Sequence, residues 1–101
     1  MKIAVETGTD RICIKLSGQL NTLTSVDFEK EVANAISSPF LNVVLDCSEL
    51  SYISSAGLRL LLTLYKGQKA KGGTFVLQHV RKEIVDLLKT TGFSSFLVIE
   101  N

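Results

Sequence analysis

The chain has 101 residues, of which 46% are hydrophobic and 21% are charged. This size and composition are typical of one globular domain, and they exclude both a multidomain enzyme and a disordered chain. Eleven Lys and Arg side chains against ten Asp and Glu leave a formal charge of +1, so bulk charge favours neither nucleic acid nor an anionic membrane as a partner. We expect a single domain over residues 1–101.

The N-terminus lacks the features of a signal peptide, because an acid stands at Glu6 and a turn signal follows it. The longest strongly apolar stretch lies around residues 60–62 and is far shorter than the roughly 20 residues that a membrane helix needs. We therefore expect a cytoplasmic protein that does not insert into membranes. In that compartment Cys13 and Cys47 are predicted to be buried thiols rather than a disulfide.

Alternating apolar and polar residues predict two strands near the N-terminus. Residues 2–7 and 12–16 both alternate, with a turn at residues 8–10 between them. The short turn makes the two strands an antiparallel pair. Gly18 is expected to close the second strand.

A helix is expected to begin at Thr22 or Thr24 and to end at residues 37–39. Its apolar residues follow helical spacing, and Thr24 stands three residues before Asp27, as in a capping box. These signals place the first helix directly after the strand pair.

A short apolar run at residues 43–45 predicts a strand at the centre of the sheet, with Asp46 at the point where the strand emerges. A second helix is predicted after the serine pair at residues 54–55, and it stops at the glycine pair at residues 72–73. Its apolar positions follow helical spacing at Leu58, Leu61, Leu62 and Tyr65.

The remaining elements are a strand at residues 74–77, a third helix that ends at Gly92 and a last strand at residues 96–99. The predicted order is β-β-α-β-α-β-α-β. Helices between strands require crossover connections, which are almost always right-handed within one sheet. The sequence therefore predicts an α/β fold with a mixed, largely parallel sheet of about five strands, an N-terminal antiparallel pair and helices layered against the sheet.

The common catalytic and cofactor-binding motifs are absent. Neither G-x-x-x-x-G-K-[ST] nor G-x-G-x-x-G occurs, so neither of the usual phosphate-binding loops is present. His79 is the only histidine, and the spacing of Cys13 and Cys47 fits no zinc site. We expect no enzymatic activity, no metal and no cofactor. A small hydrolase or a thiol-based phosphocarrier at Cys47 stays open as an alternative. It is a minor one, because no activating group accompanies the nucleophile.

The segment at residues 46–59 carries the most information about function. It follows the central strand, at the edge of the sheet where functional residues of α/β proteins gather, and it contains four serines. Either Ser54 or Ser55 is expected to cap the second helix. Gly57 in its first turn costs up to about 1 kcal/mol relative to Ala, which indicates that another backbone or a partner approaches closely there.

Three stretches share their pattern with a known family. They read Ser-Gly-Gln-Leu-Asn at residues 17–21, Val-Val-Leu-Asp-Cys-Ser at residues 43–48 and Tyr-Ile-Ser-Ser-Ala-Gly-Leu at residues 52–58. With them the chain resembles the STAS domain, and specifically the small stand-alone bacterial anti-sigma factor antagonists. The third stretch is similar to the family's most specific motif, and the resemblance covers essentially the whole chain. It implies a STAS-like fold.

The resemblance also implies a phosphorylation switch. The serine phosphorylated in that family stands two places before the glycine of the motif, and the matching residue is Ser55. The implied partners are an anti-sigma factor that is also the serine kinase, and a metal-dependent Ser/Thr phosphatase. The unphosphorylated form would bind the anti-sigma factor and free the sigma factor, and the phosphorylated form would be released. The chain would thus regulate sigma-factor-dependent transcription without contacting nucleic acid directly.

Two residues depart from the commonest pattern of the family, because Ser54 and Asn21 stand where many antagonists have Asp. Both differences remove an acid near the switch. The docking surface is expected to comprise the loop at residues 48–55, the loop around Asn21 and the first turns of the second helix. The residues predicted to bind the partner are Asn21, Thr22, Ser51, Ser54, Ser55, Gly57, Leu58 and Arg59.

A second function stays open. The chain is also compatible with a constitutive STAS subunit of a membrane-associated assembly, such as those that accompany lipid-transport ATPases. The same helix edge would then dock on a protein, and the serine would only cap the helix. Arg59 is expected either to pair with an acid of the partner or to be a solvated helix residue.

Overall fold

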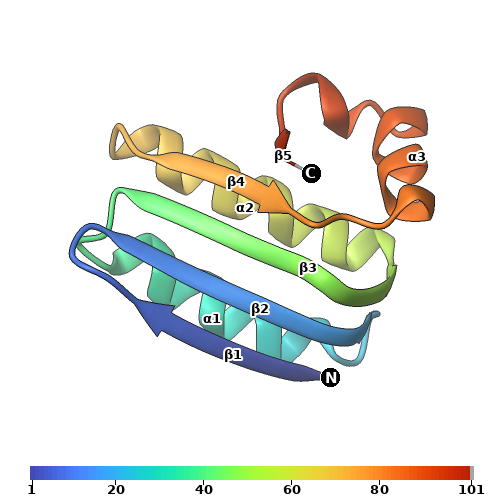
Figure 1. Ribbon diagram of the computed structural model, residues 1–101, viewed down its shortest axis with the longest axis horizontal. Helices are drawn as coiled ribbons and strands as arrows, with labels where there is room; N and C mark the ends of the chain where they lie inside the picture. The colour runs from blue at the N-terminus through green and yellow to red at the C-terminus, as the bar shows by residue number, and fades with distance from the viewer. Residues whose placement is uncertain (101) are drawn as a thin grey trace.

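The computed structural model describes residues 1–100, and its elements follow the predicted order β-β-α-β-α-β-α-β (Figure 1). The strands are β1 (Lys2–Thr7), β2 (Arg11–Leu20), β3 (Asn42–Ile53), β4 (Thr74–Gln78) and β5 (Val98–Glu100). The helices are α1 (Ser25–Ser37), α2 (Ser55–Ala70) and α3 (Lys82–Thr90), and a short 3₁₀ turn, η1, occupies Phe93–Ser95.

The five strands form one sheet in the order β1-β2-β3-β4-β5. β1 pairs antiparallel with β2, and each later neighbour pairs in parallel. A parallel pair requires a crossover connection, which α1, α2 and α3 supply in turn. The predicted mixed, largely parallel sheet is confirmed.

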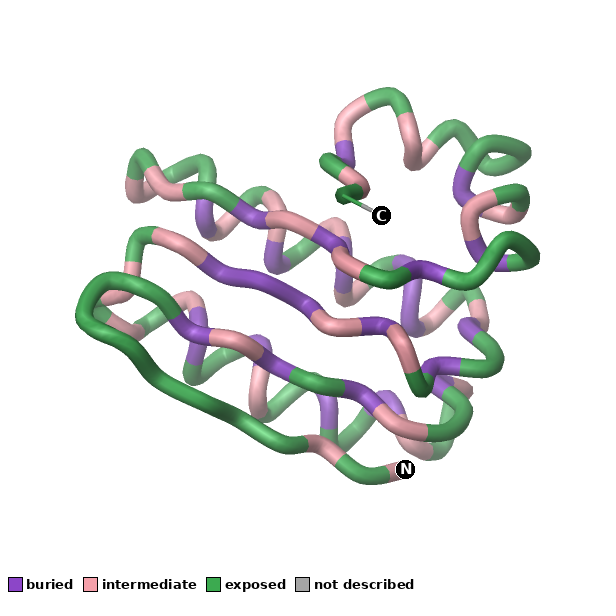
Figure 2. Tube along the Cα trace, viewed as in Figure 1, coloured by how far each residue is buried: buried purple, intermediate pink, exposed green. Residues whose placement is uncertain are grey.

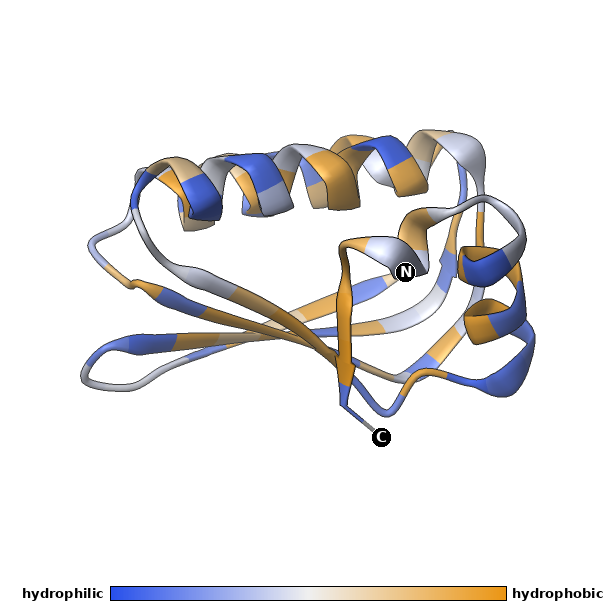
Figure 3. Ribbon diagram, turned by 90° about the horizontal axis from the view of Figure 1, so that it is seen from above, coloured by the Kyte–Doolittle hydropathy of each residue, from blue (hydrophilic) through white to orange (hydrophobic). Residues whose placement is uncertain are grey.

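Helices α1 and α2 lie side by side over one face of the sheet (Figure 3). In β2 the strand period decides which side chains face them: Ile12, Ile14 and Leu16 are buried, while Cys13 and Lys15 are more exposed. Figure 2 shows the buried positions gathered in β2, β3 and β4 and on the helices. β1 is more exposed than a half-buried strand, because it is the edge of the sheet.

The central strand is much longer than predicted, which corrects the boundaries near the functional edge. β3 does not end at Asp46 but continues to Ile53, and β2 continues through Gly18 to Leu20. Two register shifts interrupt the pairing of β2 with β3. Such irregularities break the strict alternation from which strands are predicted. Residues 48–53, expected to form a loop, are therefore part of a strand.

The boundaries of the other elements are close to those predicted. α2 begins directly after Ser54. Thr24 precedes α1, but the predicted capping box is not formed, because the Thr24 side chain makes no capping hydrogen bond and its Oγ1 donates to the Gln19 carbonyl at 2.7 Å. The last strand begins at Val98 rather than Phe96, since η1 occupies the residues before it.

Lys71, directly after α2, supplies the positive charge that the end of α1 lacks. The last turn of α1 contains no basic residue. The Nζ of Lys71 donates to the backbone carbonyls of Ala35, Ser38 and Phe40 at 3.1, 3.0 and 3.2 Å. Ala35 lies in the last turn of α1, Ser38 is its C-cap and Phe40 follows in the next segment. The ammonium group therefore joins the C-terminal end of α2 to the end of α1 and the residues after it.

The two cysteines are free thiols. Cys47 is buried, as predicted, whereas Cys13 is only half-buried because it lies on the face of β2 that points away from the helices. Within residues 1–100, no helix is long and apolar enough to cross a membrane.

Candidate functional site

Ser54 and Ser55 have different roles at the start of α2. Ser54 has an extended backbone and is the N-cap, and its hydroxyl oxygen accepts a hydrogen bond from the Gly57 N–H at 3.3 Å. Its own N–H donates to the Leu20 carbonyl at 2.8 Å, which attaches the start of α2 to the end of β2. Ser55 is the first helical residue and is exposed, and its hydroxyl has no hydrogen-bond partner within residues 1–100.

The first turn of α2 presents an electropositive helix end. It contains no acidic residue. The Leu58 N–H donates to the Ser54 carbonyl at 2.9 Å, whereas the N–H groups of Ser55 and Ala56 make no hydrogen bond in the part of the chain that the structure describes. Free N–H groups and the helix dipole together favour an anion at this position.

Gly57 explains why the start of α2 fits so closely against the sheet. The residue is buried, and a Cβ placed on it would lie 2.8 Å from Leu20 Cγ and 2.9 Å from Ile53 Cγ1. The close approach predicted at Gly57 is therefore made by side chains of this chain. Leu58 is also in the core, with 6% of its surface exposed. Gly57 and Leu58 thus position the site rather than presenting side chains to a partner, which corrects their predicted placement on the docking surface.

Asn21 organises the turn that precedes α1. Its Oδ1 accepts hydrogen bonds from the N–H groups of Leu23 and Thr24, both at 3.0 Å, and its own N–H donates to Thr24 Oγ1 at 2.9 Å. An Asp carboxylate accepts the same two hydrogen bonds, so Asn in place of Asp keeps the turn and removes only the charge. Thr22, at the tip of this turn, is exposed.

A groove of about 360 Å³ runs between the N-terminal parts of α1 and α2. It brings together Thr22 and Arg59, two residues predicted from the sequence, from opposite sides. Sequence reasoning missed its other lining residues, although helical spacing already places two of them on one face of α1. The missed residues are Ser25, Glu29, Ala56 and Leu60.

The structure adds two observations on this region to the prediction. Ser51 is exposed, but its hydroxyl donates to the Gly18 carbonyl at 3.1 Å, so it helps to hold β3 against β2. Three exposed apolar side chains were not predicted for this region of the chain. Leu23, Val26 and Tyr52 have exposed fractions of 82%, 55% and 49%.

The pKa values of Cys47 and Asp46, two neighbouring residues of β3, are shifted in opposite directions. Burial raises the pKa of Cys47 to about 12, with Asp46 adding to the effect, so its thiol keeps its proton. Burial also acts to raise the pKa of Asp46, but hydrogen bonds from Ser48 and the nearby His79 outweigh it and hold that pKa below its usual range. Among residues 1–100, no group of three or more His, Cys, Asp or Glu could hold a metal ion.

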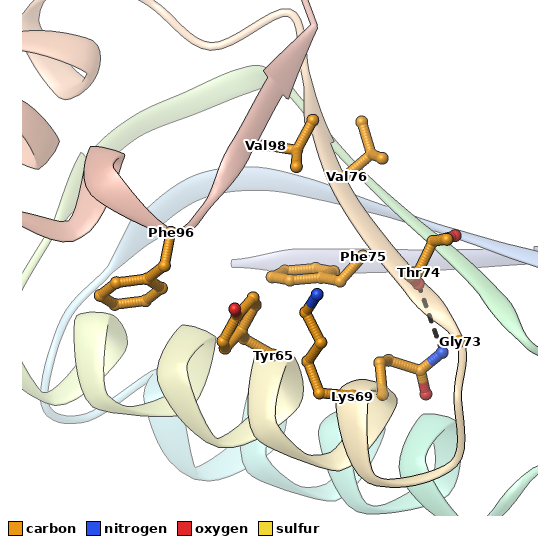
Figure 4. A pocket seen from close by; sticks show the side chains of 9 residues that line it. Tyr65, Lys69, Gly73, Thr74, Phe75, Val76, Phe96 and Val98 are labelled. Carbon is orange, nitrogen blue, oxygen red and sulfur yellow. Dashed lines mark hydrogen bonds between the residues drawn. The ribbon is translucent and has the colours of Figure 1, made fainter.

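A second cavity, of about 280 Å³, lies near the other end of α2 (Figure 4). The rings of Tyr65, Phe75 and Phe96 surround it, and Lys69 extends along it with its Nζ 5.7 Å from the centre of the Tyr65 ring. Tyr65 is ten positions after Ser55 in α2, which corresponds to about 15 Å along the helix axis. This cavity is therefore separate from the groove beside Ser55.

The family model of the STAS domain matches residues 2–101. The chain is 30% identical over 101 residues to BtrV of Bordetella bronchiseptica, named as a candidate anti-sigma factor antagonist, and the match covers 100% of this chain and 87% of that protein.

Solved structures share the fold at lower identity. A candidate anti-sigma factor antagonist from Thermotoga maritima superposes with a TM-score of 0.91 at 19% identity, over 98% of this chain and 86% of that one. The antagonist SpoIIAA in its unphosphorylated form gives 0.79 at 18% identity, over 99% and 88% of the two chains. Its phosphorylated form, from Bacillus, gives 0.77 at 18% identity, over 99% and 92%. With a family match over nearly its whole length and a relative at 30% identity, the chain belongs to the STAS domain family.

Proposed function

We propose that the chain is an anti-sigma factor antagonist that is switched by phosphorylation of Ser55. The observation that carries the proposal is the exposed Ser55 hydroxyl, which has no hydrogen-bond partner within residues 1–100 and stands on the first residue of α2. The names of the relatives support the proposal, because BtrV and SpoIIAA are described as antagonists and SpoIIAA is known in a phosphorylated form.

The proposed partner is an anti-sigma factor with serine kinase activity. It transfers the γ-phosphoryl group of ATP to Ser55 Oγ, the hydroxyl proton is lost and ADP is released. A metal-dependent Ser/Thr phosphatase restores the hydroxyl by hydrolysis and releases inorganic phosphate. The unphosphorylated protein binds the anti-sigma factor and thereby frees the sigma factor.

The physical basis of the switch is a difference between two environments of one phosphate. On Ser55 it adds a charge of about −1.5 to −2, which the α2 N-terminus favours by at most ~2 kcal/mol, so the fold tolerates it. A partner surface that fits a neutral hydroxyl instead has to accommodate a buried, unpaired charge. That costs several kcal/mol, or a hundredfold and more in affinity.

The experiment that tests the proposal is incubation with ATP and a candidate anti-sigma factor kinase from the same organism, followed by intact-mass measurement. A gain of one phosphate is expected in the natural chain and in Ser54→Ala, and no gain is expected in Ser55→Ala. If the kinase is active but adds no phosphate to the natural chain, the proposed phosphorylation switch is contradicted. That outcome would favour a constitutive STAS subunit of a membrane-associated complex.

A further inference from the structure

Ser55 and Arg59 are neighbours on the surface of α2. They are the first and fifth residues of the helix, and both are exposed. Residues four apart lie on the same helix face with their Cβ atoms about 5–6 Å apart. Helical side chains lean toward the N-terminus, so the Arg59 side chain leans toward Ser55. An anion at the first position and a cation at the fifth is also the more favourable order of such a pair.

Arg59 has no internal counter-ion. In the part of the chain that the structure describes, its guanidinium group makes no hydrogen bond and no ion pair, even though Glu29 lines the same groove. At the other end of α2 two cations are engaged, because Lys71 donates to three carbonyls and Lys69 lies over the Tyr65 ring.

The first turn of α2 contains no acid that could pair with Arg59 or offset the positive end of the helix dipole. A phosphate on Ser55 supplies the missing negative charge beside both the free N–H groups and the guanidinium. An arginine can bind phosphate oxygens through two parallel hydrogen bonds, which a lysine cannot do.

We infer that Arg59 holds the phosphate on Ser55 in the phosphorylated protein, an inference that rests on the proposed phosphorylation of that serine. The unphosphorylated protein presents Arg59 free at the rim of the groove, where it is available to an acid of the partner. Phosphorylation then weakens partner binding in two ways: it adds a dianion at position 55, and it engages the Arg59 guanidinium so that this group no longer pairs with an acid of the partner. A carboxylate at position 55 is shorter and carries less charge, so Ser55→Asp reproduces only part of the effect.

The test uses full-length protein with phosphoserine placed at position 55 by genetic encoding, which requires no kinase. The ³¹P resonance is titrated with pH in the natural sequence and in Arg59→Gln, with Arg59→Lys as the conservative variant. Loss of Arg59 is expected to move the midpoint to higher pH by about 0.3 unit, and Lys is expected to restore part of the shift. The Nε–H resonance of Arg59 is expected to move when the phosphate is present. An unchanged midpoint and an unmoved Nε–H resonance would overturn the inference.

Two control variants separate this contact from general charge effects. Lys66→Gln removes an exposed cation that lies about 16 Å from Ser55 along the axis of α2. This distance exceeds the screening length of about 8–10 Å, so the midpoint of the phosphate titration is expected to stay unchanged. Glu29→Gln removes the acid across the groove and is expected to lower the midpoint. A kinase that leaves natural Ser55 unmodified would contradict the proposed function, whereas the phosphoserine titration decides the role of Arg59 by itself.

Discussion

Gly57 lies so close to Leu20 that a Cβ on the glycine would stand 2.8 Å from Leu20 Cγ. This contact joins the end of β2 to the first turn of α2, where the Ser54 N–H also donates to the Leu20 carbonyl. The position of the Ser55 hydroxyl is therefore set by core packing on one side and by a backbone hydrogen bond on the other.

Gly57→Ala is expected to destabilise the fold, because Leu20 and Ile53 must both move to admit the new methyl group. Overpacking of this kind typically costs about 1–3 kcal/mol, and thermal or urea unfolding measures it. Ser55→Ala, two residues earlier in the same turn, removes no hydrogen bond of the described chain and is expected to stay within about 0.5 kcal/mol. Equal stability of the two variants would show that the site tolerates a side chain at position 57.

Ser54→Ala is expected to lower the free energy of unfolding by about 1 kcal/mol, because the Gly57 N–H loses the hydroxyl that caps it. Ser54→Asp keeps an acceptor at the N-cap and is expected to be as stable as the natural chain. The comparison is made by urea unfolding at neutral pH. If Ala and Asp proved equally destabilising, the serine would contribute through something other than its capping oxygen.

Local chemistry explains what the sequence predicts well. The start of α2 follows from an N-cap, a glycine and helical spacing, all within a few residues, whereas the choice of Ser55 depends on the resemblance to the STAS family. The extension of β3 to Ile53 could not be predicted in the same way, because its partner is a segment of β2 far away in the chain and the pairing contains register shifts. Pairing between distant segments leaves only a weak signal in either one alone.

The difference between local signals and contacts of distant segments also explains why only some of the predicted partner-binding residues lie at the surface. Leu58 and Gly57 stand in the same motif as Ser55, but only the three-dimensional packing shows that both are buried and that Gly57 lies against Leu20 and Ile53. Conversely, Glu29 belongs to the groove because α1 and α2 lie side by side, and nothing near Glu29 in the sequence indicates this.

Ser55→Asp is expected to weaken binding of the anti-sigma factor at least tenfold, because the partner surface has to accept a charge where it fits a hydroxyl. The melting temperature is expected to change little, since an acid at the first position of a helix interacts favourably with the dipole. Isothermal titration calorimetry gives the affinity and calorimetric unfolding gives the stability, with Ser55→Ala as the neutral control. Unchanged affinity with Ser55→Asp would defeat the interface mechanism, and a large loss of stability would point to unfolding instead.

Cys47 is expected to be unreactive in the folded protein. With burial raising its pKa to about 12, only about one thiol in 10⁴ is ionised at pH 8, and the side chain is 2% exposed. Iodoacetamide at that pH is expected to modify Cys13 first and Cys47 only after denaturation, as peptide mass spectrometry would show.

The same raised pKa predicts how stability depends on pH. The Cys47 thiol keeps its proton in the folded protein but ionises in the unfolded chain, so the free energy of unfolding is expected to fall as the pH rises above about 9. Cys47→Ser is the matched control, since a hydroxyl does not ionise in this range. Rapid modification of native Cys47 would instead revive a thiol-based function, because it would require an accessible thiolate that this packing excludes.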